Sequence, residues 1–216
     1  KHYLGLFPTV NLNYELHEMQ SFAVGYNRRI NRPRRWFINP FPSRSSESNI
    51  FQGNPGLDPA YSNTFDLGYL KHWEKFTFNA SVYYQVELTS NGIPIIRAIP
   101  INLSTNKRYG FEASFMYNPE RWLRFNGSFN LFTFRTTGEY NGVDYGAKDN
   151  SWFTRLSSKV TLPAKIDWQT NAFYRGARKN AQTETDGMFS FDMALSKDVF
   201  DGNGTIGVNV RDLLDT

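Results

Sequence analysis

The sequence predicts an all-β protein, a transmembrane antiparallel up-and-down β-barrel with about ten strands in this chain. Three observations lead to this prediction. Apolar and polar residues alternate along most of the chain, short and long links follow one another in turn, and aromatic residues make up 17% of a chain that is otherwise hydrophilic. No run of about 18 apolar residues is present in the sequence, so a transmembrane helix is not expected.

The longest alternating segment runs from Phe76 to Leu88, where every second residue is apolar and the residues between are mostly hydroxyl, amide or acidic. Such alternation places the two kinds of side chain on opposite faces of a strand. Ordinary strands have about 5 to 6 residues, whereas a tilted membrane-spanning strand needs about 9 to 11. The length of this segment therefore favours a membrane strand.

The same alternation predicts nine further strands, in chain order. They are Val10–Leu16, Phe22–Tyr26, Phe65–Tyr69, Tyr109–Tyr117, Leu123–Leu131, Trp152–Leu162, Ile166–Tyr174, Phe189–Leu195 and Ile206–Val210. Gly202-Asn203-Gly204 has the composition of a hairpin turn and separates the last two.

The links between these strands alternate in length. Short links are expected at residues 17–19, 71–75, 118–120, 163–165 and 198–204, and long links at 28–63, 89–107, 135–150 and 175–187. In an up-and-down sheet, all the tight turns then lie at one end and all the long loops at the other. Outer-membrane barrels have this asymmetry, with short periplasmic turns and longer extracellular loops.

A soluble β-sandwich is the alternative, because it also alternates apolar and polar residues. Two features favour the barrel. The polar face is rich in Ser, Thr, Asn, Gln and Gly, where a solvated sandwich face usually carries many Lys and Glu. Aromatic residues also gather at both ends of the strands, as expected for two girdles at the membrane interfaces: Trp73, Trp122 and Trp168 near tight turns, and Tyr26, Tyr109, Trp152 and Tyr174 near long loops.

Residues that could carry catalysis or hold a metal are scarce. Cysteine is absent, and the three histidines, His2, His17 and His72, lie far apart in the sequence. A ten-stranded outer-membrane protease would need histidine at the outer rim, where none is expected. Aromatic residues alternate along strands and form no stacking platform beside a basic groove, which disfavours nucleic-acid binding. The sequence therefore predicts no enzyme, no cofactor and no nucleic-acid partner.

Two sets of polar residues are candidates for function. The first is expected to line the barrel lumen, or to contact a plug: Asn79, Ser81, Gln85, Glu87, Glu112, Ser114, Arg155, Lys159, Gln169 and Asn171. The second is a basic cluster in an extracellular loop, made of Arg28, Arg29, Arg32, Arg34 and Arg35. It could bind lipid phosphates, an anionic ligand or partner carboxylates, or be a solvated loop edge with internal ion pairs. Residues 89–107 form an unusually apolar loop, which could pack on a partner or ligand.

Two adjacent segments carry a family resemblance. Tyr26–Phe41 reads YNRRINRPRRWFINPF, and Asn49–Tyr69 reads NIFQGNPGLDPAYSNTFDLGY. Together they resemble the TonB-dependent receptor-like outer-membrane β-barrel family, in which a Y-x-R-R stretch with N-P-F leads into G-N-P-x-L-x-P and then F-x-L-G-Y. Asp66 stands where glutamate is more usual. Tyr174-Arg175-Gly176 also looks like a barrel element of this family.

The resemblance implies a fold and a function for a longer protein. Members of that family have a barrel of about 22 strands around an N-terminal plug. Residues 1–216 then correspond to a barrel segment without the plug and without the closing C-terminal strand. The implied function is import of a bulky nutrient across the bacterial outer membrane. The implied partners are outer-membrane lipid, the plug, and an inner-membrane energy-transducing protein. The alternative is a non-transporting scaffold in a cell-surface complex with a surface lipoprotein or other subunits.

Overall fold

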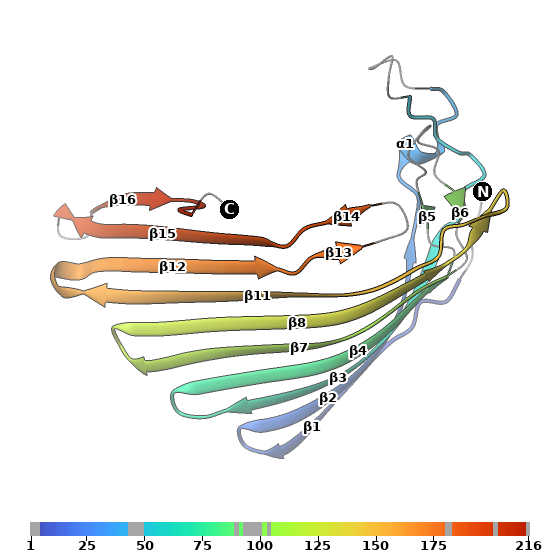
Figure 1. Cartoon of the computed structure of the whole chain (residues 1–216). Coiled ribbons are helices and arrows are strands. Elements are labelled where there is room, and N and C mark those ends of the chain that lie inside the picture. Colours follow the sequence, from blue (N-terminus) through green and yellow to red (C-terminus); the bar gives the residue numbers. More distant parts are fainter. Residues whose placement is uncertain are drawn as a thin grey trace.

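A computed structural model describes residues 5–42, 50–88, 91–92, 101–102, 105–179, 183–200 and 203–214. Its main element is a ten-stranded sheet with the order β1-β2-β3-β4-β7-β8-β11-β12-β15-β16 (Figure 1). The strands are β1 (Thr9–His17), β2 (Gln20–Asn31), β3 (Ala60–His72), β4 (Phe76–Leu88), β7 (Thr105–Glu120), β8 (Leu123–Thr137), β11 (Ala147–Leu162), β12 (Ile166–Arg175), β15 (Met188–Val199) and β16 (Gly204–Val210). Each pairs antiparallel with the next one along the chain, as the sequence predicted.

Three small hairpins and two short helical turns lie between these strands. The hairpins are β5 (Asn91–Gly92) with β6 (Ile101–Asn102), β9 (Glu139–Tyr140) with β10 (Val143–Asp144), and β13 (Arg178–Lys179) with β14 (Glu184–Thr185). All three belong to long links. The helical turns are α1 (Arg35–Ile38) and a 3-10 turn at Pro163–Lys165. Within the described residues, no helix has the length and apolar character needed to cross a bilayer.

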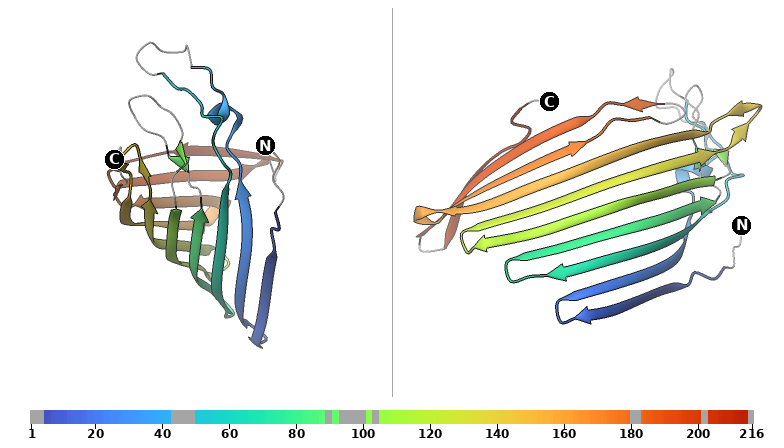
Figure 2. Two further views of the ribbon diagram at one scale, coloured as in Figure 1. Left: turned by 90° about the vertical axis from the view of Figure 1, so that its right-hand side faces the viewer. Right: turned by 60° about the horizontal axis from the view of Figure 1, so that its bottom comes forward.

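The sheet curves into a trough, and its two ends differ (Figures 1 and 2). The tight turns lie at one end, while α1 and the small hairpins lie at the other. β1 and β16 are the edge strands and do not pair with each other. The structure therefore confirms the predicted fold class in the form of part of a barrel wall rather than a closed barrel.

The outer, convex face of the sheet is apolar. Its residues follow the strand register: Val82, for example, lies opposite Leu67 on one side and Phe111 on the other. These side chains are unusually exposed, with 65% of Leu12 and 50% of Val82 accessible. In the described part of the chain, the buried hydrophobic residues other than proline and glycine are only Leu57 and Ala60. An apolar face of this extent in contact with water would be unstable, whereas contact with lipid satisfies it.

The register also shows how the turns are staggered. The tight turn between β7 and β8 lies just beyond Leu123, which pairs with Val160 of β11. The turn between β11 and β12 lies one pair further along the same face, beyond Leu162, which pairs with Ile166. Successive tight turns thus step along the register in one direction. Such a shear is what tilted strands require if their turns are to lie at one level of a barrel.

One predicted turn was misplaced. The Asn118-Pro119-Glu120 segment belongs to β7, and the turn falls at Arg121 and Trp122. The register shifts between Tyr117 and Glu120, which marks an irregularity in this part of the strand. Pro119 lacks a backbone N–H and cannot donate to the ladder, so a proline at such an irregularity is tolerated.

Exchanging one residue on each face tests the assignment of the outer face to lipid. In the full-length protein, Val82→Arg should lower the free energy of unfolding from lipid vesicles by about 2–4 kcal/mol, because it places a charge in hydrocarbon. Ser81→Arg is the matched control, because residue 81 lies on the concave face, directly opposite Glu112 of β7. An equal loss of stability in both variants would contradict the assignment.

Candidate functional site

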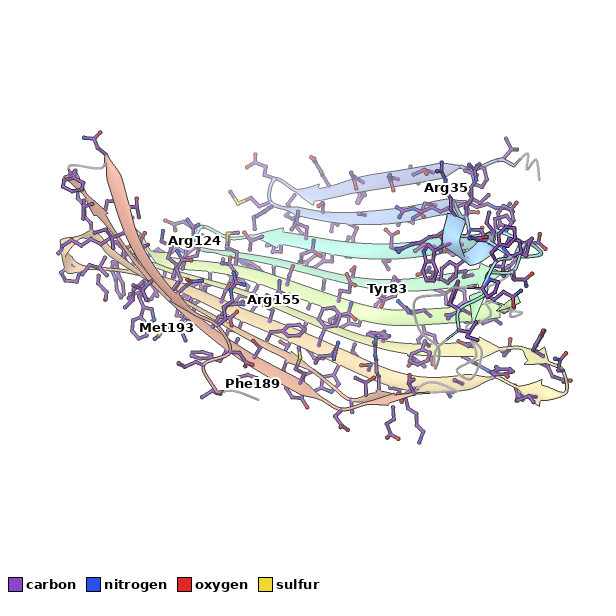
Figure 3. All side chains as sticks on the ribbon, turned by 90° about the horizontal axis from the view of Figure 1, so that it is seen from above. Arg35, Tyr83, Arg124, Arg155, Phe189 and Met193 are labelled. Atoms are coloured by element: carbon purple, nitrogen blue, oxygen red, sulfur yellow. The ribbon has the colours of Figure 1, made fainter. Side chains whose placement is uncertain are left out.

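The concave face of the sheet carries the polar residues of the strands. The register places all ten predicted lumen residues on this face: Asn79 lies opposite Ser114, Ser81 opposite Glu112, and Lys159 opposite Gln169. Gln85, Glu87, Arg155 and Asn171 alternate with outer-face residues in the same way. Figure 3 shows Tyr83, Arg124 and Arg155 on this face, and Phe189 and Met193 on the other. Their contact with a ligand or plug stays a prediction.

A hydrogen-bonded pair occupies the middle of the concave face. Asn130 lies directly opposite Glu112 and donates to the Glu112 carboxylate from its side-chain amide. Asn130 is only 6% exposed, and its Oδ1 has no hydrogen-bond partner within the described residues. A buried acceptor without a partner is costly, and this oxygen is shielded from the lumen.

Two arginines on the concave face lie over aromatic rings. The guanidinium of Arg108 is 5.2 Å from the centre of the Phe132 ring. That of Arg155 is 5.5 Å from the Phe173 ring. Cation–π contact of this kind holds a flexible side chain in one position and keeps its charge. The concave wall thus presents cations in defined positions.

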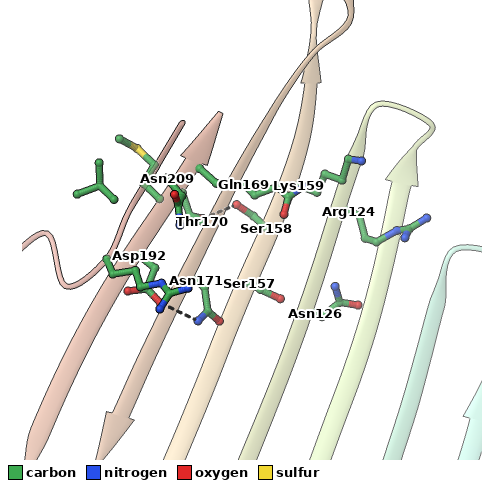
Figure 4. A pocket seen from close by; sticks show the side chains of 14 residues that line it. Arg124, Asn126, Ser157, Ser158, Lys159, Gln169, Thr170, Asn171, Asp192 and Asn209 are labelled. Atoms are coloured by element: carbon green, nitrogen blue, oxygen red, sulfur yellow. Dashed lines mark hydrogen bonds between the residues drawn. The ribbon is translucent and has the colours of Figure 1, made fainter. Parts of the chain in front are cut away.

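A hollow of about 410 Å³ lies on this face toward the tight-turn end (Figure 4). Its charged lining residues are Arg124, Lys159, Asp192 and Arg211. Lys159 pairs with Asp167, with 2.8 Å between Nζ and Oδ2. The Asp192 carboxylate accepts from the Asp212 backbone N–H at 2.9 Å and from the Asn171 amide at 3.5 Å.

Lys159 is paired with Asp167, whereas the hydrogen-bond donors of Asp192 are neutral and leave its negative charge in place. With Arg124 and Arg211, the lining therefore keeps a small excess of positive charge for a ligand or another chain segment. Arg124 is steadied by a 3.2 Å hydrogen bond from its Nε to Asn118 Oδ1. The hollow can therefore accommodate an anionic or hydrogen-bond-accepting group.

Several residues of this face were not predicted from the sequence. Tyr83, Arg108, Arg124, Asn130 and Asp192 were all missed as candidates. The signal was available, because each alternates with an apolar outer residue in its own strand: Asn130, for example, lies between Phe129 and Leu131. What alternation could not reveal is which of these polar residues meet, since that depends on the register between strands.

The long link between β2 and β3 folds into a compact unit, here called the loop cap, of residues 32–42 and 50–59. Asn54 donates its backbone N–H to Phe37 O at 2.7 Å, and the Gln52 side chain donates to Pro40 O at 2.9 Å. Trp36, Phe37 and Phe51 form an aromatic cluster, with 4.8 Å between the Trp36 and Phe51 ring centres. These contacts join the two sequence segments that carry the family resemblance.

Several motif residues have a structural explanation in the loop cap. A Cβ atom on Gly53 would lie 2.4 Å from Asn39 O and 2.7 Å from Phe37 O, so only glycine permits the two backbones to approach. Asn54 accepts the Gly56 backbone N–H on its Oδ1 at 2.8 Å, which closes a side-chain turn. Leu57 is only 3% exposed and supplies the apolar interior. Pro33, Pro40, Pro55 and Pro59 all lie outside strands, where the missing N–H of proline breaks no ladder.

The predicted basic loop cluster is divided between two elements. Arg28 and Arg29 belong to β2, so the prediction that they lie in a loop is wrong; the strand continues beyond the apolar segment on which the prediction relied. The Arg28 guanidinium lies 5.6 Å from the centre of the Tyr61 ring. Arg32 and Arg34 precede α1, and Arg35 is its first residue. Within the described residues, none of the five forms an ion pair.

Of the predicted aromatic girdle residues, those near tight turns lie at strand ends, whereas Tyr26, Tyr109 and Trp152 lie several residues inside their strands. Trp73 and Trp122 are in the turns after β3 and β7, and Trp168 is in β12 next to the 3-10 turn. At the other end, Tyr26 and Tyr109 are in β2 and β7. Trp152 and Tyr174 are neighbours whose rings are tilted by 34°, with 4.7 Å between ring centres. Their anchoring in lipid head groups stays a prediction.

Two other candidates add nothing to the site. The last residues of β1 and β3 are His17 and His72, and His2 lies outside the described residues. In the described part of the chain, no cluster of three or more metal-ligating side chains is found. Most of the apolar loop, at residues 93–100, also lies outside the described residues.

Comparisons with known proteins agree with this geometry. Residues 1–216 match the model of the outer membrane protein beta-barrel family. No curated protein matches the chain in sequence at a significant level.

Three solved structures are similar in fold. They are the siderophore receptor PirA of Pseudomonas aeruginosa (TM-score 0.73, 13% identity), a mutant of the ferric enterobactin receptor PfeA of the same organism (0.71, 13%), and the FrpB iron transporter of Neisseria meningitidis (0.68, 13%). They cover 97%, 97% and 98% of this chain, which in turn covers only 36%, 35% and 34% of theirs. The chain thus spans about a third of the length of these receptors.

Substitution of Gly53 tests whether the loop cap depends on close backbone approach. In the full-length protein, Gly53→Ala should open the cap, because the new methyl group would overlap backbone atoms of Phe37 and Asn39. Trypsin should then cleave after Arg34 and Arg35 several-fold faster, while circular dichroism shows unchanged strand content. Gly68→Ala is the control, since its Cβ would meet other atoms only at 3.8 Å or more. Equal cleavage in all three proteins would contradict this role for Gly53.

Proposed function

Because the chain belongs to the outer membrane protein β-barrel family and forms part of a barrel wall in the bacterial outer membrane, we propose that it is a segment of a receptor that imports a bulky nutrient. The observation that carries the proposal is the concave face, a polar surface that stretches across the sheet and holds positioned charges. Arg108 and Arg155 lie over aromatic rings there, and Glu112 pairs with Asn130. A barrel with such a lumen can bind and pass a polar solute.

The similar structures support this proposal. They are named as a siderophore receptor, a ferric enterobactin receptor and an iron transporter, so a similar wall occurs in proteins that bind or transport iron compounds. A ferric chelate is therefore the first class of ligand to test for this chain. In the proposed protein, residues 1–216 form a wall segment, and a plug fills the lumen.

The import mechanism assigns a task to each end of the wall. The long links at the α1 end capture the ligand, and the concave face guides it inward. The hollow around Arg124 and Arg211 lies toward the tight-turn end, where a plug or a ligand leaving the barrel would pass. An inner-membrane partner supplies the energy through the plug.

A non-transporting scaffold is the second candidate, and the loop cap favours it. The cap is held together by its own backbone hydrogen bonds and aromatic cluster, yet it presents apolar side chains outward: 75% of Phe41 and 48% of Trp36 are exposed. A rigid surface with exposed aromatic residues suits a protein partner such as a surface lipoprotein.

Uptake by energised cells separates the two candidates. Cells that express the full-length protein should accumulate a radiolabelled ferric chelate, and a protonophore should abolish the accumulation. The double variant Arg108→Gln and Arg155→Gln should lower the rate by roughly an order of magnitude, because each change removes a positioned charge from the concave face.

Lys71→Gln is the control for a lost charge, since Lys71 lies on the outer face beside Gln20. If the parent protein, present at the cell surface, accumulates none of a panel of ferric chelates and oligosaccharides above cells without the gene, the import proposal fails. A partner that co-purifies and is released by Phe41→Ser would then support the scaffold.

A further inference from the structure

Three cations lie side by side on the outer face at the long-loop end. Lys107, Arg135 and Lys148 are direct register partners on the adjacent strands β7, β8 and β11. All three side chains are exposed. The same cross-strand row continues through Val86 and Asn63 to a fourth cation, Arg28. We call Lys107, Arg135 and Lys148 the cation row.

The cation row carries uncompensated charge. Neighbouring strands are about 4.8 Å apart, so like charges directly opposite one another repel. None of the three forms an ion pair within the described residues. The carboxylates nearest in sequence, Glu139, Asp144 and Asp149, form no ion pair with the row within the described residues. Asp144 accepts the Gly146 backbone N–H at 2.7 Å, and Asp149 accepts the Lys179 backbone N–H.

The paired residues on either side of the row supply no acid either. Toward the membrane, the register places Tyr109, Thr133 and Asn150 next to the row. Away from the membrane, the register partners Thr105 and Thr137 follow. At the opposite rim, by contrast, Lys75 pairs with Glu120 at 3.3 Å. Within the described residues, no carboxylate therefore offsets the repulsion in the cation row.

The row lies at the depth of lipid head groups. One step toward the tight-turn end, the same cross-strand row contains Tyr26, Tyr84 and Tyr109. Tyrosine hydroxyls at this position suit the membrane interface, and the following step, with Val82 and Phe111, is apolar. The cations thus begin where the hydrocarbon ends, on the side of the wall that faces lipid.

We propose that the cation row binds the phosphate groups of lipid head groups in the outer leaflet. A head group is the anion that meets the outside of the wall at this depth. The Arg135 guanidinium can hold two phosphate oxygens at once, and the flanking lysines add point charges. Arg28, over the Tyr61 ring, extends the site along the rim. This site is separate from the proposed import function, because it lies on the opposite face from the lumen residues.

The test uses the full-length protein in neutral detergent micelles, with phosphatidic acid as the probe and phosphatidylcholine as the neutral lipid. Phosphatidic acid should raise the midpoint of thermal unfolding of the parent protein, and phosphatidylcholine should not. Arg135→Gln should raise the midpoint in micelles alone, since it removes repulsion, and should lose at least half of the rise that phosphatidic acid causes. Lys107→Gln should likewise raise the midpoint in micelles alone and reduce the rise that phosphatidic acid causes.

Arg108→Gln is the matched control, because Arg108 follows Lys107 in the chain but lies on the concave face. It should keep the full response to phosphatidic acid. The proposal is overturned if Arg135→Gln keeps that response, if Arg108→Gln loses it equally, or if inorganic phosphate alone stabilises the parent as much as the lipid does. Failure of nutrient uptake would leave this result unaffected.

Discussion

The requirement that every backbone N–H and C=O finds a hydrogen-bond partner inside the bilayer governs the whole structure. Hydrocarbon offers no such partners, so strands must pair without interruption across the wall. The sheet meets this requirement from β1 to β16 with each strand paired to the next along the chain. Its two edge strands present unpaired backbone groups, which only further strands can satisfy within the membrane. The ten strands are therefore stable as part of a larger wall, in agreement with the lengths of the similar receptors.

The same constraint explains which features the sequence could predict. Because lipid contacts one face and water or protein the other, alternation is imposed wherever a strand crosses hydrocarbon, and all ten strands were found from it. Beyond the hydrocarbon both faces contact water, so apolar and polar residues need not alternate and the pattern no longer shows where a strand ends. Predictions failed at those places: β2 continues through Arg28 and Arg29, and β7 continues to Glu120. The cation row and the pairing of Glu112 with Asn130 were missed because alternation is unchanged when a strand slips by two residues, so it does not fix the register.

The loop cap shows a second way to satisfy the backbone. Its chain leaves the sheet and forms few regular elements, so its polar groups depend on local turns and on contacts such as that from Asn54 N–H to Phe37 O. This explains why its sequence is rich in Gly, Pro and Asn, and why a motif could be recognised there while its structure could not be derived. The glycine requirement at position 53 arises from residues 37 and 39, which only the folded loop brings near.

Cations on both faces of the wall lie over aromatic rings, Arg108 and Arg155 on the concave face and Arg28 and Lys71 on the outer face. Within the described residues, the faces differ in that Lys159 on the concave face pairs with Asp167, whereas the cation row on the outer face has no carboxylate partner. The concave face contacts water or protein, so both acidic and aromatic side chains can lie beside a cation there. On the outer face a carboxylate beside the cation row would be repelled by anionic lipid and would lie next to hydrocarbon. The partner of an outward-facing cation is therefore best supplied by the membrane itself, which makes an unpaired cation at this depth a consequence of the protein's location rather than a defect of its fold.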